Sequence, residues 1–473
     1  MNGVIAFLAF VISVAILLFV PTLAAPYASQ YGPVTVFHCG SALLLCGLLA
    51  AIVGVIIRRE PSHGAYLLKL FLLALLIRIM IGAAIFAVNA QDFFGGDAWT
   101  YDFTGQQQLL AWSGDKFAQL NVDRFVGKSY RSGWGMVSMV AVIYGMLGRN
   151  MLAVQFVNAV LGAATAPVIF LAAKQVFNNR RVAEVAGIAV GFYPSLVLWS
   201  SQGLKDGPIV LFLALTILAT IKLGQKLSGP WIAVLVFSLL GVLAFRFYVF
   251  YMLLVAVVAA FVIGMREVTV QSLARQLVVV VLLALSLTYF GVTRYANIQV
   301  ESYADFEQLQ RTRHDAARSA QSGFGRDVDV STATGALTTI PMGMVYLLFA
   351  PFPWQLGSLR QSLTLPEMVI WWAAFPLLIL GIWFSIKYRL RQMSPILIFT
   401  SMLTLAYSVF QGNVGTAYRQ RAQVLVFYFI FVAVGAVLMK EKREEKRKRN
   451  AEELRAASVR IPRRLIKEPS RSG

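Results

Sequence analysis

Apolar runs of about 20 residues recur along the whole chain, and they limit what this sequence can fold into. A helix of that length crosses a hydrocarbon core of about 30 Å. Strands are excluded, because an isolated strand in lipid leaves its backbone unpaired and the alternating pattern of a barrel is absent. Only 14% of the residues are charged, against about 25% in a soluble domain. The sequence therefore predicts an all-α integral membrane protein.

The apolar runs and the placement of Lys and Arg together predict twelve transmembrane helices. With twelve, the short basic connections RREPSHG, KQVFNNRR, MREVTVQSLARQ and KYRLRQM all lie in the cytoplasm. Both chain ends lie there as well, as expected for a multi-pass protein of the bacterial plasma (inner) membrane. The spans are expected near residues 4–24, 36–57, 67–88, 151–173, 183–200, 208–224, 231–247, 249–264, 275–292, 367–386, 394–411 and 423–439.

Two further apolar stretches, residues 133–148 and 339–354, have about 16 residues each, a length that suits an interfacial segment as well as a span. If both crossed the membrane, there would be fourteen spans, and KQVFNNRR would lie outside, against the positive-inside rule. We therefore expect both on the outer face. The resulting membrane domain covers residues 1–439, with outer loops at 89–150 and 293–366.

Residues 440–473 form a basic tail, with thirteen Lys/Arg and six Asp/Glu. Directly after a transmembrane helix, such a tail indicates the cytoplasmic side and contact with anionic membrane lipids. Nucleic acid is not an expected partner, because the tail has no aromatic residue for base stacking. The chain has two cysteines, Cys39 and Cys46, which we interpret as packing residues.

A polar segment, FFGGDAWTYDF at residues 93–103, follows the third expected span on the outer side. An acid such as Asp97, fixed at the lip of a cavity, can remove a proton from a hydroxyl group at the membrane surface. Gly95 and Gly96 would let the backbone approach a bound group closely. The alternative is that Asp97 is a solvated loop residue. The residues that follow it fit a helix lying along the interface.

Four segments resemble, in this order, the GT-C superfamily of polytopic membrane glycosyltransferases: GGDAWTY, LGRNMLAVQFVNAVLG, FNNRR and YPSLVLWSSQGLKD. This superfamily uses polyprenyl-phosphate sugars and includes the protein O-mannosyltransferases and the lipid A aminoarabinose transferase. The resemblance covers roughly residues 67–265. It implies a GT-C-like fold with interfacial helices in the first large outer loop.

The resemblance also implies roles for individual residues. The essential acid of the first outer loop is Asp97, and Tyr101 completes the Asp-Ala-x-x-Tyr pattern. A second acid after the next outward span is Asp206, although an acid at that position also suits the start of a helix. The first outer loop has no Asp-x-Asp motif, so a divalent metal ion is compatible with the resemblance but not indicated.

A lipid-phosphate donor requires cations at the membrane surface, preferably arginine forks. Arg246, Arg419 and Arg421 lie on the expected outer face, where Lys and Arg should be rare, and we interpret them as phosphate-binding residues. The alternative is that they extend to lipid headgroups. Lys205 is expected either to pair with Asp206 or to bind a phosphate.

The long outer loop at residues 310–337 is rich in Arg, Ser, Thr and Gly. With Arg313 and His314 it suits a lid that handles an anion and becomes ordered when substrate binds. A loop whose charges are simply solvated is equally compatible with the composition.

These features predict an inverting glycosyltransferase that moves a sugar from a polyprenyl-phosphate donor to a lipid- or glycan-linked acceptor at the outer face. The expected setting is cell-envelope or exopolysaccharide assembly. Asp97 would deprotonate the acceptor, and arginines would stabilise the leaving phosphate.

Two alternatives stay open. A polysaccharide polymerase or O-antigen-type ligase with a lipid-diphosphate donor would depend on the Arg/His loop instead of Asp97. A lipid or polysaccharide transporter would need internal repeats, broken helices and acids within the spans. The sequence shows no repeat and has almost no acid inside its expected spans.

Overall fold

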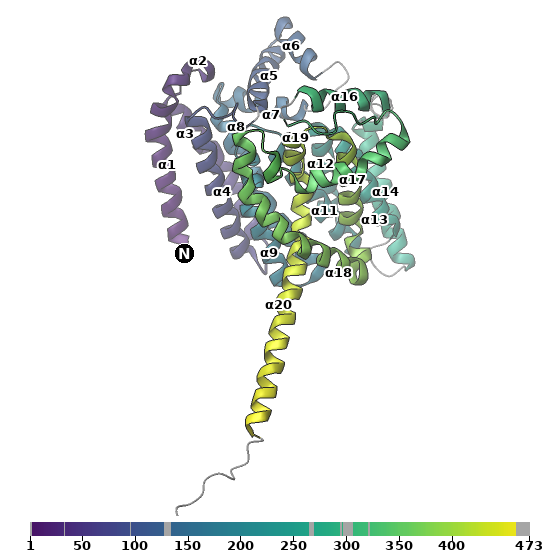
Figure 1. Ribbon diagram of the computed structural model, residues 1–473. Helices are drawn as coiled ribbons and strands as arrows, with labels where there is room; N and C mark the ends of the chain where they lie inside the picture. The colour runs from purple at the N-terminus through teal and green to yellow at the C-terminus, as the bar shows by residue number, and fades with distance from the viewer. Residues whose placement is uncertain are drawn as a thin grey trace, which may run out of the picture.

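The regular elements of the structure, a computed structural model, are all helices (Figure 1). The structure describes residues 2–32, 34–94, 96–126, 134–263, 269–293, 296, 306–319 and 322–459. Gly95 and the end of the tail, 460–473, lie outside these ranges. Within them, seven helices are long and apolar enough to cross a membrane, or eight if one bent pair is a single span. The all-α membrane architecture is confirmed, whereas the count of twelve stays a prediction.

The helices fall into three groups. The long apolar ones are α1 (Asn2–Ala24), α3 (Val36–Arg58), α4 (Gly64–Ala87), α8 (Met151–Phe177), α11 (Asp206–Gln225), α18 (Leu359–Phe410) and α20 (Ala422–Val459). The shorter apolar ones are α7 (Trp134–Leu147), α9 (Arg180–Phe192), α10 (Pro194–Ser200), α12 (Gly229–Phe245), α13 (Phe247–Ile263), α14 (Val270–Tyr289) and α17 (Ala333–Phe349). The connections contain η1 (Ala25–Tyr27), α2 (Ala28–Tyr31), α5 (Asp97–Trp112), α6 (Lys116–Val126), α16 (Phe306–Ser319), η2 (Pro353–Gln355) and α19 (Val414–Gln420).

Each of the twelve expected spans corresponds to helical chain, but two of them share one helix. Residues 367–386 and 394–411 both lie in α18, where Arg389 leaves helical geometry at φ −137° and ψ 21°. Arg389 divides α18 into an arm at 359–388 and an arm at 390–410. The span expected at 183–200 is the bent pair α9 and α10, which turns by 52°.

Local sequence explains where these helices start. Asn413 accepts a hydrogen bond from the Gly415 amide (2.9 Å) and so caps the first turn of α19. Tyr193 adopts extended backbone angles and Pro194 begins α10, because proline suits the first position of a helix but cannot continue the one before it.

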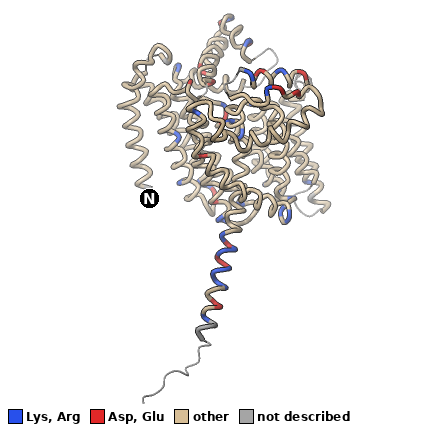
Figure 2. The backbone as a smooth tube through the Cα atoms, in the orientation of Figure 1, with Lys and Arg blue, Asp and Glu red and all other residues tan. Residues whose placement is uncertain are grey.

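The two ends of the bundle differ in what they carry. The N-terminus of α1 and the protruding part of α20 lie at one end, whereas α5, α6, α16 and α19 lie at the other (Figure 1). The protruding part of α20 carries Lys and Arg together with some Glu (Figure 2). The loop helices and the charged tail are therefore on opposite sides of the apolar bundle.

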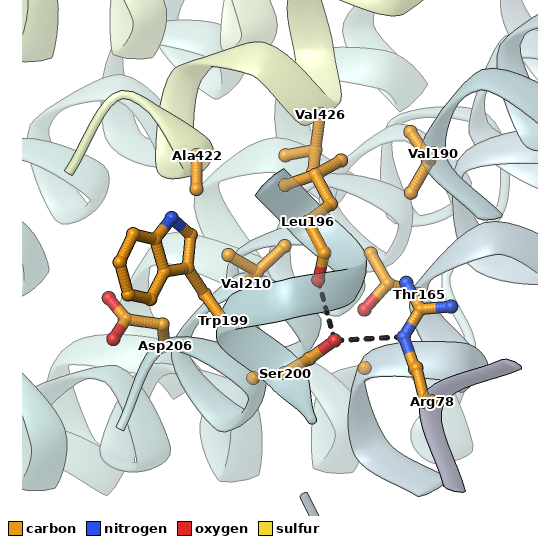
Figure 3. A pocket seen from close by; sticks show the side chains of 12 residues that line it. Arg78, Thr165, Val190, Leu196, Trp199, Ser200, Asp206, Val210, Ala422 and Val426 are labelled. Atoms are coloured by element: carbon orange, nitrogen blue, oxygen red, sulfur yellow. Dashed lines mark hydrogen bonds between the residues drawn. The ribbon is translucent and has the colours of Figure 1, made fainter. Parts of the chain in front are cut away.

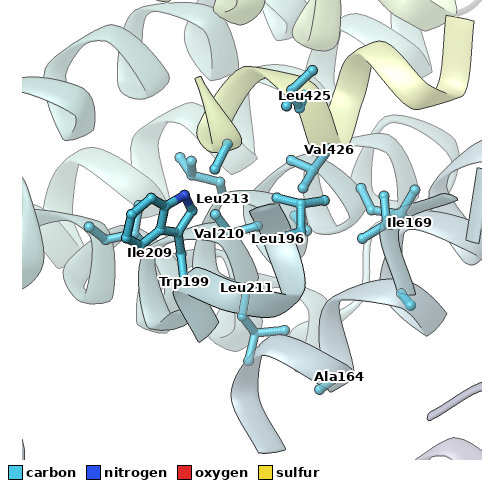
Figure 4. Close-up of a cluster of buried hydrophobic side chains, with 14 of the residues drawn as sticks. Ala164, Ile169, Leu196, Trp199, Ile209, Val210, Leu211, Leu213, Leu425 and Val426 are labelled. Atoms are coloured by element: carbon cyan, nitrogen blue, oxygen red, sulfur yellow. The ribbon is translucent and has the colours of Figure 1, made fainter. Parts of the chain in front are cut away.

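The core is centred on α8 and on the first half of α20. In each of these two helices, 83% of the residues in the most apolar stretch of 18 are buried. Leu425 and Val426 of α20 lie close to Leu196, Trp199 and Val210 (Figure 4). These apolar contacts hold the turn between α10 and α11 in place. Cys39 and Cys46 are buried and unbonded to each other, which confirms that they are packing residues.

Candidate active site

Arg419, in α19, connects two carboxylates that lie far apart in the sequence. Its Nη1 pairs with Asp97 Oδ2 at the start of α5. Its Nε and Nη2 lie 2.7 Å from Asp206 Oδ2 at the start of α11. Arg246 approaches the other oxygen of Asp206 at 3.6 Å. Four segments of the chain are thus joined by one set of charges, and the first and the last of them, at Asp97 and Arg419, lie more than 300 residues apart in the sequence.

The two acids differ in exposure, and this difference separates their roles. The Asp97 side chain is 52% exposed, whereas that of Asp206 is 2% exposed. Asp206 lies between two guanidinium groups and behind the surface that a substrate could reach. Asp97 stands at the first position of α5, where the helix dipole favours a negative charge.

The turn that presents Asp206 is fixed from below by Asn158 of α8. Its Nδ2 donates to the carbonyl oxygens of Gln202 and Leu204, both at 2.6 Å. Asn158 and Gln202 are fully buried. The position of Lys205 and Asp206 is therefore set by the core rather than by solvent.

A cavity of about 1080 Å³ opens beside these charges. Its polar wall carries Asp97, Lys205, Arg246, Arg360, Glu367 and Arg419. Its apolar wall is formed by Ile77, Ile81, Phe192, Leu198 and Leu363, among others. The cavity therefore combines several cations with a surface that suits a hydrocarbon chain, and Asp97 stands at its edge.

Lys205 is the cation of this wall whose charge is most sensitive to its surroundings. Burial lowers the pKa of Lys205 to about 7, and the neighbouring Arg246 contributes in the same direction. A lysine with this pKa is neutral in about half of the molecules at pH 7, and a bound anion would favour its charged form. This behaviour fits the phosphate-binding interpretation of Lys205.

Asp102, the second acid of FFGGDAWTYDF, has a structural role. It is buried, and it pairs with Arg149, whose Nε lies 3.2 Å from Asp102 Oδ2. Tyr144 of α7 donates to its other oxygen. These contacts attach α5 to α7 and to the turn before α8, and they fix the helix that carries Asp97.

Besides Asp206, which lies behind the cavity wall, four residues predicted for the site do not line the cavity. Tyr101 is buried and packs edge-on against Phe125, with ring centres 6.1 Å apart. Arg421 is fully buried and donates to the carbonyl oxygens of Leu348 (3.0 Å) and Ala350 (3.3 Å).

The predicted lid residues are also placed elsewhere. Arg313 of α16 is buried and donates to the carbonyl oxygens of Val409 (3.1 Å) and Gly325 (3.0 Å). His314 is half-buried on the same helix and does not line the cavity. Arg313 therefore anchors α16 to the end of α18. Its Nη2 has no hydrogen-bond partner among the described residues, but it is buried away from the cavity.

Glu367 was missed by sequence reasoning. It lies in the first arm of α18, is 4% exposed and accepts a hydrogen bond from Tyr418 Oη at 2.8 Å. The sequence did contain a signal for this residue, namely an acid directly after Pro366 at the start of an apolar run. Acids inside membrane helices are rare and usually functional.

Arg78, in the middle of α4, serves the bend between α9 and α10. It donates to Ser200 Oγ (2.8 Å) and to the Gly191 carbonyl (2.8 Å), whose helix ends nearby. Arg78 and Ser200 border a small cavity of about 20 Å³, which Trp199 and Asp206 also line (Figure 3). Arg78 thus stabilises a broken helix beneath the site.

Among the described residues, no group of three or more His, Cys, Asp or Glu side chains is arranged to hold a metal ion. The acids of the site are instead each surrounded by arginine or tyrosine.

Comparison with known protein families supports part of this interpretation. No curated protein matches the chain. The model of the dolichyl-phosphate-mannose-protein mannosyltransferase family matches residues 136–290, about a third of the chain, which includes Lys205, Asp206 and Arg246 but neither Asp97 nor Arg419. Over residues 136–290 the resemblance to the GT-C glycosyltransferases is therefore confirmed, by similarity to dolichyl-phosphate-mannose-protein mannosyltransferases.

Proposed function

We propose that this protein is an inverting membrane glycosyltransferase that uses a polyprenyl-phosphate sugar. The acceptor is a lipid- or glycan-linked hydroxyl at the outer face of the plasma membrane, in cell-envelope or exopolysaccharide assembly. The observation that carries the proposal is the shared cavity of Asp97, Lys205, Arg246 and Arg419 beside an apolar wall. A lipid phosphate needs both surfaces at once.

In the proposed reaction, Asp97 takes the proton of the acceptor hydroxyl as its oxygen attacks the anomeric carbon. The bond between that carbon and the phosphate oxygen breaks, and polyprenyl phosphate leaves with the electron pair. Arg419 and Lys205 stabilise the negative charge that develops on the phosphate. Asp97 is suited to the role of base because its carboxylate is half-exposed at the cavity edge.

We assign Asp206 a positioning role in place of the catalytic role that the resemblance implies. Its carboxylate is 2% exposed and bonded to Arg419, so it reaches a substrate only through the arginines that it orients. The polymerase or ligase alternative has less support, because Arg313 and His314 do not line the cavity.

The test is donor consumption by membranes that contain wild type or Asp97→Asn protein at equal levels, with a panel of radiolabelled polyprenyl-phosphate sugars. Loss of a general base lowers the rate about 10²- to 10⁴-fold. Asp123→Asn is the matched control, since Asp123 lies on the same expected outer loop and, among the described residues, bonds Gln119 (2.8 Å) on α6 and none of the cavity residues. Wild-type activity in Asp97→Asn would exclude this role, and an inactive wild type would exclude the function.

A further inference from the structure

The wall of the cavity holds an acid that the proposed reaction does not use. Glu367 lies in the apolar first arm of α18, and Tyr418 holds its Oε2 at 2.8 Å. Its other oxygen, Oε1, is buried and makes no hydrogen bond to the described residues. A carboxylate within a membrane helix is costly unless its oxygens find partners.

Ser195 lies beside this carboxylate on the neighbouring helix α10. Ser195 is 2% exposed, its hydroxyl and its backbone lie close enough to interact with Glu367, and its Oγ has no other hydrogen-bond partner among the described residues. Both Glu367 and Ser195 line the same cavity as Asp97. Two buried polar groups, from two helices, thus share unused hydrogen-bonding capacity at one place on its wall.

This polar pair is adjacent to the phosphate-binding cations. Tyr418, which holds Glu367, precedes Arg419 directly in α19. The Trp199 ring contacts both residues, with its centre 6.4 Å from that of Tyr418 and 5.7 Å from the Arg419 guanidinium carbon. A ligand whose phosphate lies at Arg419 would therefore place the group that is bonded to this phosphate near Glu367.

The chemistry of the pair selects the kind of group that it binds. A carboxylate accepts hydrogen bonds and repels a phosphate, whereas a serine hydroxyl both donates and accepts. Arg421 lies behind the Tyr418 ring and donates to backbone carbonyls, so it does not neutralise Glu367 by a direct bond. A neutral group with several hydroxyls is what this corner of the cavity can satisfy.

We propose that Glu367 and Ser195 bind hydroxyl groups of the transferred sugar and so distinguish a sugar-bearing donor from the bare lipid phosphate. This inference rests on the proposed function, because it assumes that the phosphate lies at Arg419. Glu367 acts as the acceptor of hydrogen bonds, and Ser195 fixes the orientation of the ring.

The test compares two ligand classes on purified protein in lipid nanodiscs. The probes are undecaprenyl phosphate and the same lipid bearing mannose, glucose, galactose or N-acetylglucosamine. We expect wild type to bind at least one sugar-bearing lipid about 10- to 100-fold more tightly than the bare lipid, the range of one or two hydrogen bonds to a charged group. Glu367→Gln should lose this preference and keep its affinity for the bare lipid.

Two further variants and a control complete the design. Ser195→Ala should lose a smaller part of the preference, and Arg419→Gln should weaken the binding of both classes. Glu445→Gln makes the same chemical change on the exposed tail helix and should behave as wild type. Retained affinity for the bare lipid also shows that Glu367→Gln and Ser195→Ala are folded.

The outcomes separate the two proposals. If Glu367→Gln and Ser195→Ala keep the preference, or if wild type has none for any sugar, the sugar subsite is wrong while the phosphate site stands. If wild type binds neither class, the proposed function fails and the subsite fails with it.

Discussion

Arg419 contacts carboxylates from two separate helices, and its neighbours determine what each substitution would do. Sequence alone placed Asp97, Lys205, Arg246 and Arg419 on one face, and the structure brings all four to one cavity. These residues could be chosen from the sequence because Lys and Arg are uncommon on the outer face of a membrane protein. The contact between residues 97 and 419 could not be predicted, since it depends on how distant helices pack.

Arg421 shows the limit of such reasoning. Two positions along a helix turn a side chain by roughly 200°, so Arg419 and Arg421 cannot face the same cavity. An arginine near a helix end looks the same in a sequence whether it binds a ligand or caps carbonyl groups. Glu367 was overlooked for the related reason that one acid at a span boundary resembles an ordinary interfacial residue.

Substituting Asp206→Asn should destabilise the protein. The change leaves Arg246 as a buried charge without a carboxylate partner and Arg419 with Asp97 alone, which costs about 3–5 kcal/mol of unfolding free energy. Thermal unfolding in detergent would measure this loss, with Asp123→Asn as the control. Adding Arg246→Met to Asp206→Asn should recover part of the stability. An unchanged unfolding temperature in Asp206→Asn would contradict the described ion pairs.

Donor binding should weaken as the pH rises through about 7, where Lys205 loses its proton. Its pKa is lowered by burial, so Lys205 is charged below this pH and neutral above it. An anion binds the charged form more tightly, and affinity should fall by up to about tenfold per pH unit above 7.

The probe for this measurement is the sugar-bearing lipid, because a phosphodiester carries one fixed negative charge near neutral pH. Lys205→Arg keeps its charge and should give a flat profile between pH 6 and 9. A wild-type profile as flat as that of Lys205→Arg would remove Lys205 from the phosphate site.

At the scale of elements, α5 is placed by how closely it approaches α7. A Cβ atom on Gly105 would lie 2.3 Å from Val140 Cγ1, which is too close for any real contact. Glycine at this position allows the two helices to touch, and the Asp102 contacts with Tyr144 and Arg149 then lock them. The orientation of Asp97 follows from this packing.

The prediction is that Gly105→Ala separates α5 from α7. Overpacking of this kind costs about 1–3 kcal/mol locally, and amide exchange in residues 97–112 should rise together with a loss of transferase activity. Gly145→Ala is the matched control, because its Cβ would meet only the Leu109 side chain at 3.4 Å. Equal behaviour of the two variants would show that the close approach does not position Asp97.

Hydrophobic runs were enough to find the helices but not their lengths in the membrane. Residues 183–200 form one apolar run, yet Pro194 breaks it into two helices that meet at 52°. The break is compensated by Arg78, whose role in α4 has no signal in the local sequence. Tertiary partners of this kind explain why the fold class could be predicted while the span count could not.

At the scale of the whole molecule, α5 and α19, which carry Asp97 and Arg419 of the cavity wall, lie at the end of the apolar bundle opposite to the protruding part of α20 (Figures 1 and 2). Cysteine labelling tests the orientation that the basic connections predict. In spheroplasts, a membrane-impermeant maleimide should label Asp327→Cys, whereas Lys448→Cys should react only after permeabilisation. Wild type is a suitable background, since Cys39 and Cys46 are 0% and 3% exposed. The reverse labelling pattern would show that the protein has the opposite orientation in the membrane.

The long separation between the residues that Arg419 joins has a consequence for how the protein is made. A ribosome delivers Asp97, Asp206 and Arg246 to the membrane early, and Arg419 arrives only after more than 400 residues. Until α19 emerges, the two acids have no shared counterion and one side of the cavity is missing. The proposed activity therefore begins with the insertion of the last helices, and a chain that stalls before them would occupy the membrane with an incomplete site.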